Sequence, residues 1–377
     1  MLGVWLATAS AAGPAQFETT LPPGVKAVWD LDKAHRTATP TRERVCLNGL
    51  WRWQPASGLG APSPDTNWGF FKVPGCWPGV SDYMQKDSQM VFVHPNWKDQ
   101  NTRNLTMAWY ERELNVPLEW TGRRIALSIE NLNSLAAVFV DGKKAGELRF
   151  PAGELNLTTF VQPGGQHRLT LFVRALPLKE VMLAFTDTAA AKEVRGAVAR
   201  RGLCGDVFLV SSPDQAHITN VKVDPSFRQR AITFHADLAT LADGASYRLT
   251  AKVSDQGRVE KTFASPPFKS ADLKNGRFTF TESWLPEKLW DLHTPQNQFD
   301  LELSLTDGAG RVLDVYFPTR FGFREFWIDG PDFKLNGTRV FWSGVPLDNA
   351  QVGAAAANYA AAKETFLRLQ SIGLNMV

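Results

Sequence analysis

Tryptophan is the residue type that most directly offers binding chemistry in this sequence, which holds 13 of them among 377 residues. An indole face stacks on the face of a sugar ring and its N–H donates a hydrogen bond, so tryptophan suits carbohydrate binding. Trp97 stands in the polar stretch HPNWKDQ, residues 94–100, whose charged and amide groups favour an exposed loop. We therefore name Trp97 as a candidate substrate-binding residue. The alternative is a loop that packs on its own domain.

Other residue types capable of chemistry are scattered along the chain. Five more tryptophans fall among predicted strands, where large aromatics usually fill the interior: Trp51, Trp53, Trp68, Trp77 and Trp109. Structural roles are also favoured for the histidines His35, His167, His217, His235 and His293. The three cysteines, Cys46, Cys76 and Cys204, form an odd, widely spaced set that argues against a disulfide framework and a zinc site. We expect no metal and no cofactor.

Composition indicates several globular domains. A chain of this length with 44% hydrophobic residues can fill two or three cores. The 41 basic and 38 acidic residues give a net charge of +3 without a basic run, so nucleic acid is not an expected partner. No apolar run reaches 18 residues, so no membrane span is expected.

The elements that must position any site are mostly strands. Apolar residues alternate at Ile125, Leu127 and Ile129, and Asp141-Gly142 marks a hairpin turn. Short strands with Gly and Pro between them predict a mainly β domain over residues 27–213, of sandwich or jelly-roll type. About seven more strands over residues 214–324 predict an immunoglobulin-like β-sandwich.

The periodicity changes near the C-terminal end. Asn336-Gly337 is typical of the turn of a tight hairpin, because both central residues need positive φ. From about residue 354 to 372 apolar residues recur at helical steps, Gly373 ends the predicted helix, and residues 374–377 predict a buried strand. A strand, a helix and a second strand indicate the start of a parallel α/β architecture over residues 325–377.

The N-terminal residues 1–26 are interpreted as a leader and linker. MLGVWLATASAA has a short apolar core followed by small residues near Ala11 and Ala12, but lacks the positively charged start of a secretion signal. This pattern favours a periplasmic or extracellular protein. The alternative is an ordinary disordered N-terminus on a cytoplasmic protein.

Several stretches, taken in order, resemble signatures of glycoside hydrolase family 2. They are LNGLWRWQP (47–55), VPGCWPG (73–79), AWYERELNVP (108–117), RRIALSIENLNSLAAVFVDGKKAGE (123–147), RGLCGDVFLV (201–210), LWDLHTPQNQFDLELSL (289–305) and the junction FGFREFWIDGPDFKLNGTRVFWSG (321–344). Their order implies a jelly-roll sugar-binding domain, an immunoglobulin-like domain and the start of a catalytic (β/α)8 barrel.

The resemblance implies a retaining exo-glycosidase that acts on a β-linked glycoside or oligosaccharide. In the family, two barrel glutamates serve as acid/base and nucleophile, and this chemistry needs carboxyl groups about 5–5.5 Å apart. The family's acid/base follows an asparagine, yet this sequence contains no Asn-Glu pair. Only 33 residues follow Gly344, whereas an eight-stranded barrel takes about 250. We therefore assign no catalytic residue and expect an inactive, truncated fragment.

One departure from the family pattern concerns the sugar site. Many members read Arg-Gly-Val-Asn-Arg-His after the first barrel strand, whereas this chain reads SGVPLD over residues 343–348. Asp348 occupies the position of the sugar-lining histidine and is our second candidate substrate-binding residue. An aspartate reverses the hydrogen-bonding character of that position, which puts galactosidase or glucuronidase specificity in doubt. Gly205 likewise replaces an arginine that commonly precedes the aspartate equivalent to Asp206.

A function from a different class stays open, namely a non-catalytic carbohydrate-binding or scaffold protein made of two β-sandwiches. A barrel that stops after two strands would leave apolar faces and strand edges unpaired, which is a liability for a working binding protein. The sequence therefore favours the truncated enzyme.

Overall fold

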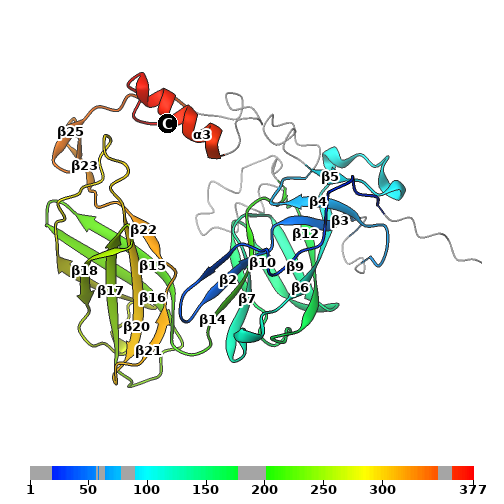
Figure 1. Ribbon diagram of the computed structural model, residues 1–377, viewed down its shortest axis with the longest axis horizontal. Coiled ribbons are helices and arrows are strands. Elements are labelled where there is room, and N and C mark those ends of the chain that lie inside the picture. Colours follow the sequence, from blue (N-terminus) through cyan, green and yellow to red (C-terminus); the bar gives the residue numbers. More distant parts are fainter. Residues whose placement is uncertain (1–18, 57, 59–63, 78–89, 177–200, 347–358) are drawn as a thin grey trace, which may run out of the picture.

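The computed structural model describes residues 19–56, 58, 64–77, 90–176, 201–346 and 359–377. Within these ranges the chain is mainly β, as predicted, and forms two separate apolar cores followed by a short C-terminal segment. Figure 1 shows the two β units side by side, with the C-terminal helix near the top of the view. None of the helices in the described ranges has the length and apolarity needed to cross a bilayer.

The first β unit consists of two sheets that share one core. The five-stranded sheet has the order β1 (Arg36–Ala38), β2 (Glu43–Cys46), β14 (Val207–Pro213), β7 (Arg123–Ile129) and β11 (Gly153–Asn156). The seven-stranded sheet has the order β10 (Lys143–Arg149), β9 (Leu135–Val140), β12 (Gln166–Arg174), β6 (Met107–Asn115), β3 (Gly49–Pro55), β4 (Gly69–Val73) and β5 (Val91–Phe92). Smaller elements are the pair β8 (Leu132–Asn133) and β13 (Gly202–Leu203), and the 3-10 turns η1 (Pro95–Trp97), η2 (Thr102–Asn104) and η3 (Leu118–Trp120).

Two-residue alternation explains why the two sheets pack face to face around one core. Trp51 and Trp53 of β3 point into the core together with Tyr110 of β6, and all three are fully buried. The predicted turn at Asp141-Gly142 is present between β9 and β10, with φ of 49° and 78°. Aspartate and glycine tolerate these left-handed angles, so the hairpin register follows from the sequence.

The second β unit also has two sheets. One has the order β15 (His217–Ser226), β16 (Ala231–Ala239) and β19 (Arg277–Ser283); the other has the order β18 (Arg258–Ala264), β17 (Tyr247–Asp255), β20 (Phe299–Asp307) and β21 (Val312–Val315), with β22 (Thr319–Phe321) also paired to β20. A short 3-10 turn, η5 (Ser270–Asp272), follows β18. The predicted alternation of Leu249, Ala251 and Val253 holds, because all three side chains are buried on one face of β17.

The two β units meet at a buried ion pair. Arg42, in the turn before β2, donates from Nε to Asp314 Oδ1 of β21 at 2.8 Å, and its Nη2 contacts both Asp314 Oδ2 and the carbonyl of Ile218. Asp314 is fully buried and also accepts from the backbone N–H of Ile218 (2.7 Å) and from Thr41 Oγ1 (2.9 Å). The Tyr316 ring covers the guanidinium at 4.9 Å. These contacts join the first unit to the second through side chains rather than through a shared sheet.

The C-terminal segment holds three short strands and a helix. The strands β23 (Phe326–Asp329), β24 (Asp332–Leu335) and β25 (Thr338–Val340) form one antiparallel sheet, and the helix α3 spans Tyr359–Ser371. The helix was predicted over residues 354–372, and the first five of these lie outside the described residues. Gly373 has φ of +84°, as a helix-terminating glycine should. The described residues contain no closed barrel.

Candidate functional site

The junction that leads into the C-terminal segment is fixed by one hairpin turn. Asn336 and Gly337 have φ of 48° and 85°, as predicted for this turn. The Asn336 side chain accepts from the backbone N–H of Glu325 (2.9 Å) and donates to the carbonyl of Trp290 (2.8 Å). The hairpin is thus attached to the second β unit.

A carboxylate strengthens the same attachment. Glu325 accepts from the backbone N–H (2.9 Å) and Nε (2.7 Å) of Arg228 and from Ser226 Oγ (3.0 Å). Partial burial would raise the pKa of Glu325, but the hydrogen bonds from Arg228 and Ser226 outweigh it, so the pKa lies below its ordinary value. An ionised, fully hydrogen-bonded Glu325 serves as an anchor for the junction rather than as an acid.

After the hairpin comes the first parallel strand contact among the residues that the structure describes. Gly344 pairs with Met376 in a parallel bridge, and the Asn375 N–H donates to the Ser343 carbonyl at 2.9 Å. The Asn375 side chain adds two bonds, accepting from the Ser343 N–H (2.9 Å) and donating to the Phe341 carbonyl (2.8 Å). A Cβ at Gly344 would lie 2.8 Å from the Met376 Cε, so glycine permits this close approach. The predicted strand at residues 374–377 is present only as this bridge.

The parallel direction decides where a site can form. The carboxyl ends of parallel strands meet at the same edge, and barrel active sites lie at that edge. The described residues there, 343–346 and 374–377, include no acidic side chain. Asp348 follows this edge by two residues but lies outside the described residues, so its substrate contact stays a prediction. The edge can position a site, but its described residues provide no carboxylate that could act as acid, base or nucleophile.

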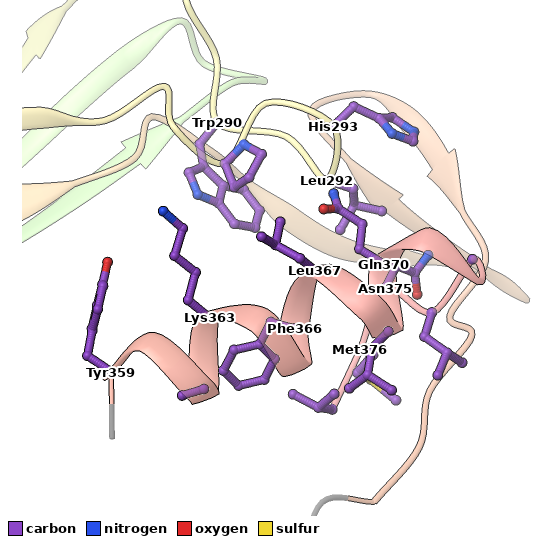
Figure 2. A pocket seen from close by; sticks show the side chains of 16 residues that line it. Trp290, Leu292, His293, Tyr359, Lys363, Phe366, Leu367, Gln370, Asn375 and Met376 are labelled. Carbon is purple, nitrogen blue, oxygen red and sulfur yellow. The ribbon is translucent and has the colours of Figure 1, made fainter. Parts of the chain in front are cut away.

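A groove of about 680 Å³ lies between α3 and the connection that precedes β20. Figure 2 shows Trp290 and Leu367 facing each other across it, with Lys363 projecting from the helix and Asn375 and Met376 at its end. Leu367 and Phe366 remain about half exposed. Most of the residues that line this groove are apolar, so it suits a protein segment better than a polyhydroxylated sugar.

Trp97, the other predicted site residue, lies elsewhere and is buried. Only 6% of its surface is exposed, so the expected exposed position was wrong. Its Nε1 donates to the Asn67 carbonyl at 2.8 Å, and its ring packs edge-on against Trp53 at 5.4 Å. The turn η1 and the close approach of Gly69 hold it in the first core, since a Cβ at Gly69 would lie 2.5 Å from the ring. These contacts support the packing alternative, and the structure does not bring Trp97 together with the strand edge.

Most of the remaining candidates have the predicted structural roles. Trp51, Trp53, Trp77 and Trp109 are buried, whereas Trp68 is partly exposed. His167 contacts Asp141 at 2.7 Å and His235 contacts Asp224 at 3.0 Å, both within their own β unit. The described residues contain no cluster of three or more His, Cys, Asp or Glu that could hold a metal ion.

Two features of the first β unit were missed from the sequence. Arg112 lies inside the core, 5.2 Å from the Trp51 ring, and burial lowers its pKa to about 10. Its only signal was its place in the inward-facing alternation with Tyr110 and Leu114. The Sγ atoms of Cys76 and Cys204 lie 3.3 Å apart, although 128 residues separate them in sequence. No local sequence pattern predicts a contact between residues so far apart in the chain.

Comparisons with known proteins place this architecture. No family model matches the chain. It is 25% identical over 349 residues to a putative β-glucuronidase of Formosa agariphila, covering 89% of this chain and 38% of that protein. It is also 25% identical over 340 residues to the β-glucuronidase of Felis catus, covering 81% of this chain and 48% of that protein.

Solved structures share the fold. The β-glucuronidase of Ruminococcus gnavus in complex with D-glucuronic acid superposes with a TM-score of 0.58 at 17% identity, covering 82% of this chain and 50% of that one. The β-D-glucuronidase of Dictyoglomus thermophilum gives the same TM-score and identity over 82% and 48%. The chain therefore spans about half or less of the length of its relatives. These comparisons confirm the resemblance to family 2 glycosidases that the sequence motifs indicated.

Proposed function

We propose that this chain is the N-terminal portion of a retaining exo-β-glycosidase. One observation carries the proposal: the chain matches β-glucuronidases over more than four fifths of its length, in sequence and in fold. The finer assignments are part of the proposal. The first unit is a jelly-roll sugar-binding domain (27–213), the second an immunoglobulin-like sandwich (214–324), and residues 325–377 begin a (β/α)8 barrel.

The exposed face of α3 supports the barrel assignment. Phe366 and Leu367 are about half exposed, and Ile372 and Phe341 are 74% and 80% exposed. In a barrel, the outer helices and the strands cover such faces mutually. A carbohydrate-binding protein built from the two β units alone gives these residues no partner, so the non-catalytic alternative is not favoured.

The proposed substrate is a β-linked glycoside, with β-glucuronides the first class to test because the named relatives are β-glucuronidases. Chemistry requires two carboxylates about 5–5.5 Å apart at the strand edge, and we place both beyond Val377. In this proposal Asp348 follows the first barrel strand and contacts the sugar, while the two β units hold the barrel in position.

Two activity measurements test the proposal. The 377-residue chain should not hydrolyse aryl β-glucuronides, β-galactosides, β-mannosides or β-glucosaminides above the buffer blank, because a positioned nucleophile and general acid are each worth orders of magnitude. The protein encoded by the complete reading frame should hydrolyse one of these classes and release the β-anomer first, as NMR can follow. Turnover by the 377-residue chain that disappears on changing one of its own glutamates would contradict the proposal.

The localisation proposal is separate. We infer a periplasmic or extracellular protein from residues 1–26, and fusion of this segment to a reporter that is active only after export tests it. An inactive fusion whose reporter accumulates inside the cell would favour the cytoplasmic alternative.

A further inference from the structure

Two cysteine side chains face each other in the first β unit. Cys76 follows β4, Cys204 follows β13, and their Sγ atoms are 3.3 Å apart. The backbone fixes this approach, because Gly75 N–H donates to the Leu203 carbonyl (2.8 Å) and Trp77 N–H donates to the Arg201 carbonyl (2.9 Å). Two hydrogen bonds that flank the cysteines keep the two backbone segments side by side, so Cys76 and Cys204 are held as neighbours.

The surroundings restrict how the two segments can move. The Cys204 N–H donates to the Asn131 carbonyl at 2.9 Å, which fixes the second segment to the strand connection beside it. A Cβ at Gly202 would come within 2.7 Å of both Trp77 Nε1 and Tyr110 Oη, so this backbone is packed against the core. Sulfur atoms held in this way need only a small further approach to bond.

The two thiols differ in access. Cys76 is 3% exposed, whereas Cys204 is partly exposed, so a reagent from solvent meets Cys204 first. The partly exposed thiol of Cys204 can therefore react with an oxidant. The buried thiol of Cys76 can then attack the mixed disulfide that forms on Cys204.

We propose that Cys76 and Cys204 are a redox pair that closes to an intramolecular disulfide in an oxidising environment. The oxidant is a small-molecule disulfide. The Cys204 thiolate attacks one sulfur of that disulfide and releases one small thiolate, leaving a mixed disulfide. The Cys76 thiolate then attacks Cys204 Sγ and releases the second small thiolate. The protein loses two hydrogens, and the reagent is reduced to two thiols.

This bond would link β4 and β13 across 128 residues of chain. A link over so long a loop restricts the unfolded chain strongly. We expect the oxidised protein to melt higher than the reduced protein by on the order of 5 °C.

The test uses the 377-residue chain, treated either with oxidised glutathione or with dithiothreitol. Free thiols are then blocked in acid and denaturant, and the protein is digested without reduction and mapped by mass spectrometry. Cys46, the third cysteine, provides the matched control variant C46S. The variant C204S removes the more exposed partner, and thermal melting is recorded for all proteins in both states.

We expect one linked peptide joining residues 76 and 204 in the oxidised wild type and in C46S, with a melting increase that dithiothreitol reverses. In C204S, both the linked peptide and the redox dependence of melting should vanish. A glutathione adduct that persists on Cys204, or a link that involves Cys46, would overturn the proposal. Because the peptide map of the wild type decides this alone, misfolding of C204S cannot mask the result.

Discussion

The first β unit and the C-terminal segment contain similar kinds of residues but use them differently. Trp51 and Trp53 are fully enclosed by two sheets, whereas α3 has no buried residue, and Phe366 is 47% exposed. The helical pattern of α3 was strong enough to predict its existence, yet the pattern alone supplies no partner for its apolar side chains. Most of the stability of a protein helix comes from tertiary packing. The comparison shows that local periodicity and a completed core are separate conditions.

The largest effect on stability should come from the contact between the first and second β units. Asp314→Ala leaves the buried Arg42 guanidinium without its carboxylate, and breaking a buried pair in this way costs about 3–5 kcal/mol. Urea unfolding monitored by tryptophan fluorescence measures the loss. The control is Asp300→Ala, whose partner Arg320 is exposed, with an expected cost of about 0–1 kcal/mol. If the unfolding free energy of Asp314→Ala falls by no more than that of the control, about 0–1 kcal/mol, the buried ion pair between the units adds no stability.

A matched pair of aromatic truncations tests the comparison directly. Trp97→Ala removes a side chain from the first core and should cost about 3 kcal/mol, whereas Phe366→Ala on α3 should change stability by no more than about 0.5 kcal/mol. Chemical denaturation of both variants gives the two values. In the complete enzyme, Trp97→Ala should lower the melting temperature and leave kcat/KM nearly unchanged. An increase in KM at unchanged melting temperature would instead restore the substrate-contacting role.

The exposed face of α3 should bind apolar probes. In the 377-residue chain, Leu367→Ser should reduce the fluorescence of a bound anilinonaphthalene sulfonate dye, because Leu367 lines the groove opposite Trp290. The control Glu364→Ser changes the same helix at a residue outside that lining and should leave the signal unchanged. If both variants give the wild-type signal, the dye binds elsewhere and the groove is not the dominant apolar surface.

The smallest effect concerns a surface pair on the second β unit. The Arg277 guanidinium beside Asp237, with contacts of 2.6 and 2.9 Å, holds the pKa of that carboxyl below its usual value of 3.8. A lowered pKa in the folded state contributes stability at higher pH, and this contribution disappears as the pH falls through the folded-state value. Melting of Asp237→Asn should therefore depend less steeply on pH below about pH 4 than melting of the wild type. Asp214→Asn, at an exposed carboxylate between the β units, is the control.

Local features of the fold could be predicted because they depend on neighbouring residues. The turns at Asp141-Gly142 and Asn336-Gly337 follow from residues that accept positive φ, and Gly373 ends the helix for the same reason. The alternation of Leu249, Ala251 and Val253 fixes which face of β17 is buried. In each case the physical cause lies within a few residues of its effect.

Long-range contacts could not be predicted, because no local pattern encodes them. Arg42 and Asp314 are 272 residues apart, and the sequence around either residue gives no indication of its partner. Trp97 looked exposed because Lys98, Asp99 and Gln100 follow it, yet its own ring turns inward beside Trp53. Polar neighbours describe the environment of a loop, but they do not determine the direction of one side chain. For the candidate site, the sequence indicated the strand edge near Asp348, and the structure describes that edge only up to Pro346.

The contact between the two β units at Arg42 also affects how the two units can tilt against each other. One guanidinium is held by the Asp314 carboxylate, by the Ile218 carbonyl and by the Tyr316 ring, so a tilt of one β unit against the other strains three contacts together. Hydrogen-bond geometry weakens steeply with angle. Under an applied force, the two β units should therefore resist small tilts strongly. Beyond a small tilt the three contacts should break together, rather than stretch gradually as in a flexible hinge.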